Sequence, residues 1–99
     1  MNIAENHLEH IVEVRQGSLE AMRGQAPFGM ALVNIVAEVV AELTPAIVPL
    51  LAPGGLFVGA GILEAKERLV RRAFQDQGLA VVGRRQEGDW VGLIGKRGC

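Results

Sequence analysis

The sequence predicts an α/β domain with a mostly parallel sheet and an antiparallel hairpin at its C-terminal end. Two nearly unbroken apolar runs, at residues 28–33 and 56–63, are typical of strands buried on both faces. A helical pattern separates them, and two neighbouring parallel strands need a crossover of this kind. Two further apolar runs near the C-terminus flank a short polar turn, which predicts the hairpin.

Length and composition limit the possible classes of protein. With 99 residues the chain forms one small domain, and its 49% hydrophobic and 21% charged residues are typical of a globular fold. No apolar run reaches the ~20 residues of a membrane-spanning helix, so we expect a cytoplasmic protein without a membrane partner. The net charge of −1 gives no basic surface for phosphates, so we expect no nucleic-acid partner.

Metal and thiol chemistry have little support in the sequence. Cys99 is the only cysteine and the last residue, so it has no partner for a disulfide or a metal site. His7 and His10 are spaced to share a helix face, but no third ligand follows at a fixed spacing. We therefore interpret both histidines as surface residues and expect no metal site.

The first predicted strand covers residues 11–15, where apolar and charged residues alternate and leave one face exposed. Gly17 and Ser18 follow it and allow two interpretations. They can form a turn in which Ser18 caps a short helix, or they can let the backbone approach a ligand. The turn is favoured by the residues alone.

Asn34 directly follows the apolar run of residues 28–33. A buried amide without hydrogen-bond partners costs about 1–3 kcal/mol, so this side chain needs a partner. It can cap the helix that begins near Val36. It can also point into the crevice that open α/β sheets leave at the carboxyl ends of their strands. The residues do not favour either alternative.

The helix expected at residues 36–51 has apolar residues spaced by three and four. Because prolines break a helix, we expect a kink or restart near Thr44, which would cap a second piece that has Pro45 at its first position. Pro53-Gly54-Gly55 is expected to end the helix and turn the chain into the next strand.

The second buried run contains Gly59 and Gly61, which are typical of a bulge, of close packing against a helix, or of room for a ligand. The helix at residues 64–77 has an apolar stripe and charges that can pair along its exposed face. The hairpin then follows, and Trp90 begins its last strand. A tryptophan in that position is expected to be packed in the core rather than to act as a stacking surface.

Several motifs in this order resemble one known family. They are Val33-Asn34-Ile35, an Ala-Glu-rich helix, Leu51-Ala-Pro-Gly-Gly, Gly61-Ile-Leu-Glu and Glu87-Gly-Asp-Trp-Val. Together they resemble the C-terminal part of the methyltransferases that modify protein eleven of the large ribosomal subunit. These enzymes are Rossmann-like and S-adenosylmethionine-dependent. The resemblance implies that residues 1–99 form one partial methyltransferase domain that lacks the N-terminal nucleotide-binding strands.

The resemblance also implies roles for three residues. Asn34 would be the catalytic residue and would lie beside the cofactor, S-adenosylmethionine, and the amine of a ribosomal protein substrate. Gly17 and Ser18 would bind the cofactor near its adenine. The family's Gly-rich loop and ribose-binding acid have no counterpart, so we expect a fragment of a protein N-methyltransferase that is inactive alone. The alternative is a small, non-catalytic α/β binding or assembly module.

The missing strands have a further implied consequence. In such sheets the absent first strand lies beside the strand that residues 28–33 form here. Without it, these residues would be an exposed apolar edge, and such edges pair with other chains. We therefore expect self-association of the chain through the edge of residues 28–33.

Overall fold

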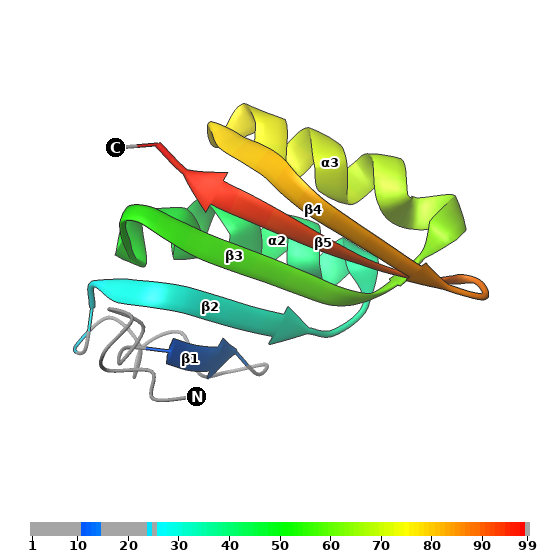
Figure 1. The fold of residues 1–99 in the computed structure, drawn as a ribbon, viewed down its shortest axis with the longest axis horizontal. Coiled ribbons are helices and arrows are strands. Elements are labelled where there is room, and N and C mark those ends of the chain that lie inside the picture. Colours follow the sequence, from blue (N-terminus) through cyan, green and yellow to red (C-terminus); the bar gives the residue numbers. More distant parts are fainter. Residues whose placement is uncertain (1–10, 15–23, 25, 99) are drawn as a thin grey trace.

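The computed structural model describes residues 11–14, 24 and 26–98. In this part of the chain one sheet of five strands, in the order β1-β2-β3-β5-β4, lies in front of two α-helices (Figure 1). Two short 3₁₀ segments, η2 and η3, precede β3 and α3. The elements are β1 (Ile11–Val14), β2 (Phe28–Asn34), α2 (Ala37–Ile47), η2 (Val48–Leu50), β3 (Leu51–Leu63), η3 (Glu64–Lys66), α3 (Glu67–Asp76), β4 (Leu79–Glu87) and β5 (Trp90–Arg97).

The predicted α/β class and the C-terminal hairpin are confirmed, but the sheet is only partly parallel. β1, β2 and β3 run parallel to one another, whereas β5 is antiparallel to both β3 and β4. A two-residue turn at Gly88 and Asp89 joins β4 to β5, and Gly88 takes a positive φ of 60° there. This tight turn reverses the chain, so the C-terminal half of the sheet cannot be parallel.

The prediction that residues 28–33 form an exposed edge is wrong. β2 is hydrogen-bonded on both sides, because β1 pairs with residues 30–33 and β3 pairs along the other side. The outer strands of the described sheet are β1 and β4. Self-association through β2 would therefore require β1 to leave it first.

The described core lies between the sheet and the two helices, which pack side by side on one face (Figure 1). Phe57 of β3 and Phe74 of α3 are fully buried, and their rings meet edge-on with centroids 5.0 Å apart. Ala31 and Val33 of β2 are buried on the helix side, but Met30 and Leu32 alternate with them and are only half-buried. The prediction that both faces of this strand are buried thus holds only for the face that the helices cover.

The expected restart of the helix near Thr44 is wrong. α2 continues without a break through Pro45 to Ile47, and the 3₁₀ segment η2 follows it. Thr44 is buried and its hydroxyl donates a hydrogen bond of 2.7 Å to the carbonyl of Val40, so it does not cap a new helix. Burial of Val40 and Ile47 against the sheet stabilises the continuous helix despite the proline.

Pro53, Gly54 and Gly55 lie within β3 rather than in a turn before it. Between Phe28 and Met30 of β2 the facing residue of β3 jumps from Leu51 to Leu56, so these residues form an irregular, bulged stretch. Gly54 has a φ of 77° there, which favours glycine. The segment therefore bends the strand, as bulges do, without ending it.

An ion cluster joins α3 to the outer strand β4. Both Arg84 and Arg71 donate hydrogen bonds of 2.7–2.8 Å to the carboxylate of Glu67. The bonds from Arg84 are the main reason why the pKa of Glu67 falls from its ordinary value of 4.5 to about 2. Burial opposes this effect, and Arg71 adds to it. The carboxylate is thus held ionised in the folded protein.

Glu67→Gln is expected to lower the free energy of unfolding at pH 7 by about 1 kcal/mol, since the pair is near the surface but bidentate. A lowered pKa in the folded state stabilises the protein above pH 4.5, and this contribution is lost as the pH falls towards 2. Urea unfolding should therefore show that the free energies of unfolding of the original chain and of Glu67→Gln converge as the pH falls from 7 to 2. The control is Glu42→Gln, which removes an exposed carboxylate of α2; a pH-independent difference for Glu67→Gln would contradict the prediction.

Candidate functional site

Asn34 lies at the carboxyl end of β2, between two parallel neighbours, and its side chain is exposed. It does not cap α2: the cap position is Val36, which forms no side-chain hydrogen bond. Among the described residues none is hydrogen-bonded to the amide of Asn34. The capping alternative is therefore wrong, and the amide is exposed at the carboxyl edge of the sheet, where open α/β sheets bind their ligands.

Gly61 of β3 provides the space that the Asn34 side chain occupies. A Cβ atom on Gly61 would lie 2.7 Å from Oδ1 of Asn34, and the φ of Gly61 is 75°. Beside it the register of β3 against β5 shifts between Gly59 and Ile62, so that β3 has an extra residue. Such bulges re-aim side chains next to functional sites. A Cβ on Gly59 would meet Val40 of α2 at 3.4 Å, which is ordinary van der Waals contact, so packing of the helix does not require glycine at this position.

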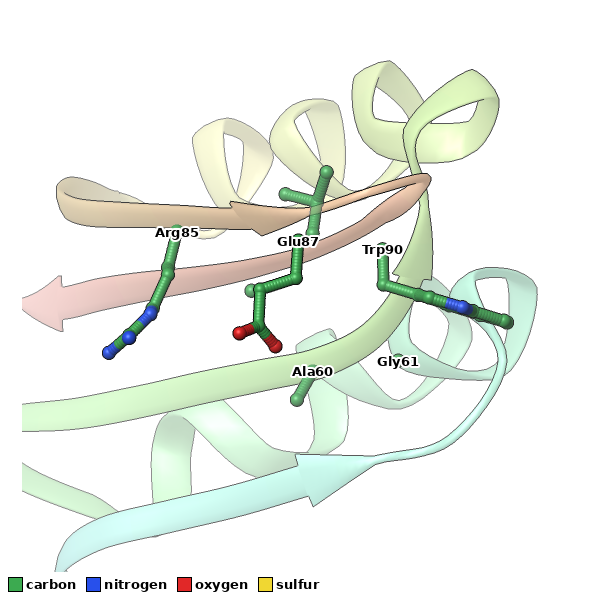
Figure 2. A pocket seen from close by; sticks show the side chains of 7 residues that line it. Ala60, Gly61, Arg85, Glu87 and Trp90 are labelled. Atoms are coloured by element: carbon green, nitrogen blue, oxygen red, sulfur yellow. The ribbon is translucent and has the colours of Figure 1, made fainter.

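A hollow of about 200 Å³ opens at the bulge (Figure 2). Its floor is made by residues with little or no side chain, where β3 and β5 meet. Arg85 and Glu87 reach from β4 towards β3, while the ring of Trp90 extends away from both, past Gly61 (Figure 2). The lining residues are Ala60, Gly61, Arg85, Glu87, Trp90, Val91 and Gly92.

The expectation that Trp90 is packed in the core is wrong. Its side chain is 56% exposed, whereas Val91 and Leu93 are buried. The strand alternates, so Trp90 lies on the face opposite the helices. The sequence held a signal for this placement, because the apolar residues Val91 and Leu93 are in phase with each other and out of phase with Trp90. Sequence reasoning also missed Glu87 and Arg85.

The chemistry that these groups offer is polar and suited to a nitrogen ligand. The amide oxygen of Asn34 can accept a hydrogen bond from an amine N–H. The carboxylate of Glu87 has no ion-pair partner among the described residues, so it can accept a hydrogen bond from an amine, and Arg85 balances its charge in the lining of the hollow. These features fit the recognition of a basic group at the carboxyl edge of the sheet.

Several residues that the sequence analysis discussed lie outside the described part of the chain. They are Gly17 and Ser18, which the resemblance assigns to the cofactor, and His7, His10 and Cys99, for which we expect no site. In residues 11–14, 24 and 26–98 no three His, Cys, Asp or Glu side chains gather as metal ligands. No helix in the same residues is long and apolar enough to cross a membrane. Of the three residues that the resemblance places beside S-adenosylmethionine, the structure therefore describes Asn34 alone.

The comparison with solved structures supports the fold. Ribosomal protein L11 methylase from Lactobacillus delbrueckii subsp. bulgaricus superposes with a TM-score of 0.71 at 23% identity, over 75% of this chain and 38% of that chain. A T. thermophilus 16S rRNA methyltransferase, solved with AdoMet and guanosine, has a TM-score of 0.54 at 23% identity over 75% of this chain and 21% of its own. The described sheet and helices are thus arranged as in methyltransferases.

Sequence comparison gives the family. A curated ribosomal protein L11 methyltransferase of Listeria monocytogenes is 37% identical over 97 residues, which are 98% of this chain and 31% of the relative. The chain therefore spans about a third of the length of such relatives. The family model described as ribosomal protein L11 methyltransferase (PrmA) matches residues 1–98. Because this match covers almost the whole chain, the chain belongs to the ribosomal protein L11 methyltransferase family.

Proposed function

We propose that this chain is the C-terminal part of a protein N-methyltransferase that uses S-adenosylmethionine and acts on a ribosomal protein. In this proposal Asn34 positions the acceptor amine. The observation that carries it is the exposed Asn34 amide, which no described residue hydrogen-bonds, at the carboxyl edge of the sheet in a chain of this family. Gly61 leaves the room that the amide needs.

The proposed role of Asn34 is orientation. Its carbonyl accepts a hydrogen bond from an N–H of the neutral amine, and this bond directs the nitrogen lone pair towards the methyl group. When bound, S-adenosylmethionine would supply an electrophilic methyl group. The carboxylate of Glu87 accepts a hydrogen bond from the amine in its cationic form before the proton leaves to solvent.

Asn34→Ala is expected to lower kcat/KM about 100-fold, since poor orientation of the reacting groups has effects of this size. The assay uses a chimera in which residues 1–98 replace the matching segment of the Listeria monocytogenes relative. Transfer of a labelled methyl group to the purified ribosomal protein is measured. The matched control is Gln75→Ala, which removes an exposed amide from α3. Full activity of the Asn34→Ala chimera would contradict the proposed role.

We also propose that the 99 residues alone are inactive, because the described residues supply Asn34 but no Gly-rich loop for the cofactor. Isothermal titration of the chain with S-adenosylmethionine serves as the companion control of the chimera assay. We expect no binding in the micromolar range. Micromolar binding would mean that these residues contain the cofactor pocket.

A further inference from the structure

A second hollow, of about 230 Å³, shares Gly61 and Trp90 with the first. Its apolar walls are Val36, Leu63 and Trp90, whose side chains are 61%, 43% and 56% exposed. Ala37, Gly61, Glu38 and Lys66 complete the lining. Single exposed apolar residues are ordinary, but several that line one hollow indicate a binding surface.

The fold brings these three side chains together at the carboxyl edge of the sheet. Val36 precedes α2, just after β2 ends. Leu63 is the last residue of β3, and it pairs with Trp90, the first residue of β5. A hydrogen bond of 2.8 Å from the amide of Glu64 to the carbonyl of Asp89 fixes this pair at the end of the hairpin. The walls are therefore held by three different elements.

The rim of the hollow carries no net charge. Nζ of Lys66 lies 3.8 Å from Oε2 of Glu38, so the two charges balance each other. Neither a cation nor an anion is favoured by this surface, whereas an uncharged apolar group gains from leaving water. The volume is several times the roughly 30 Å³ that one water molecule occupies. A side chain therefore fits the hollow better than a single water does.

We propose that this hollow binds an apolar side chain of the substrate polypeptide, carried by a residue next to the one whose amine is methylated. The proposal rests on the proposed function, because Gly61 both lines this hollow and lies against Asn34. The neighbouring residue of the substrate is thereby selected for its apolar character, and the amine is delivered beside the Asn34 amide.

Trp90 offers a direct measurement, because it is the only tryptophan of the chain. N-acetyl-leucyl-lysine amide and N-acetyl-seryl-lysine amide are titrated separately into the full 99-residue chain, and indole emission is followed. We expect a saturable blue shift with the leucyl peptide and about tenfold weaker binding of the seryl peptide. Equal responses to the two peptides, or no response to the leucyl peptide, would overturn the proposal.

Two variants test the location. Val36→Ser changes one exposed wall of the hollow, and Val82→Ser changes a similarly exposed valine on β4, since the exposed fractions are 61% and 56%. We expect Val36→Ser to reduce leucyl-peptide binding to the level of the seryl peptide and Val82→Ser to leave it unchanged. Equal effects of both variants would refute the site. If the emission shifts with protein concentration alone, a second copy of the chain binds in the hollow, and the proposal is also refuted.

The chimera distinguishes failure of this inference from failure of the proposed function. It also tests the inference if the isolated chain does not unfold cooperatively. In the chimera we expect Val36→Ser to raise KM about tenfold for the leucyl peptide but not for the seryl peptide, with kcat unchanged. An unchanged KM would overturn the inference while methylation continues. Loss of the Asn34 dependence would overturn the proposed function even if the leucyl peptide still binds.

Discussion

Replacing Gly61 by alanine is expected to lower the free energy of unfolding by about 1–3 kcal/mol and to displace the Asn34 amide. The φ of Gly61 is 75°, a conformation that costs other residues energy of this order. In addition, the new methyl group would lie 2.7 Å from Oδ1 of Asn34. One of the two groups must move, and the exposed amide is the more mobile.

Gly78→Ala is the matched control for this substitution. The φ of Gly78 is 74°, but a Cβ there would meet nothing within 4 Å. Urea unfolding should therefore show the backbone penalty in both variants and a larger loss in Gly61→Ala. In the methyltransferase chimera, Gly61→Ala should slow methyl transfer and Gly78→Ala should not. Equal stability and equal activity of the two variants would mean that Gly61 does not make room for Asn34.

Phe74→Ala is expected to have the largest effect on stability, a loss of about 3–5 kcal/mol. The Phe74 ring is fully buried and meets Phe57 edge-on. It lies so close to Gly95 that a Cβ atom added to this glycine would be 3.0 Å from the ring. The ring therefore fills the space between α3, β3 and β5, which alanine would leave empty. For a small domain this loss is a large part of the total stability.

Chemical denaturation followed by circular dichroism measures this effect. Leu69→Ala is the control on the same helix, because Leu69 is 44% exposed and its truncation should change stability by about 0.5 kcal/mol or less. A small change for Phe74→Ala, similar to that for Leu69→Ala, would mean that α3 does not pack on the sheet as described.

The local patterns predicted several elements well. The apolar run of residues 28–33 became β2, and the alternation in residues 11–15 became β1 at Ile11–Val14. The short polar turn became the reversal of the β4–β5 hairpin. The glycines at positions 59 and 61 predicted a bulge, close helix packing or ligand space. The structure shows a register shift between Gly59 and Ile62 and room for Asn34 beside Gly61. Backbone and side-chain preferences of this kind act over a few residues, so sequence can report them.

Two of the predictions that failed, at Pro45 and at residues 28–33, depended on contacts between distant residues. Pro45 was expected to interrupt a helix, but burial of Val40 and Ile47 keeps α2 continuous. Residues 28–33 were expected to be an edge, but β1 occupies that side. Trp90 was assigned to the core because of its size, although its place in the strand puts it on the open face. Tertiary packing thus outweighed the local preference of Pro45, whereas the alternation of residues along β5 already indicated the exposed position of Trp90.

The sequence by itself determined the family, the α/β class and Asn34 as the candidate residue, because motifs and apolar periodicity follow directly from residue order. Only the tertiary structure decided that the Asn34 amide is exposed without capping a helix, that Gly61 makes room for it, and that Val36, Leu63 and Trp90 share one hollow. These residues are far apart in the chain, and the pairing of β2, β3 and β5 is what brings them to one edge of the sheet.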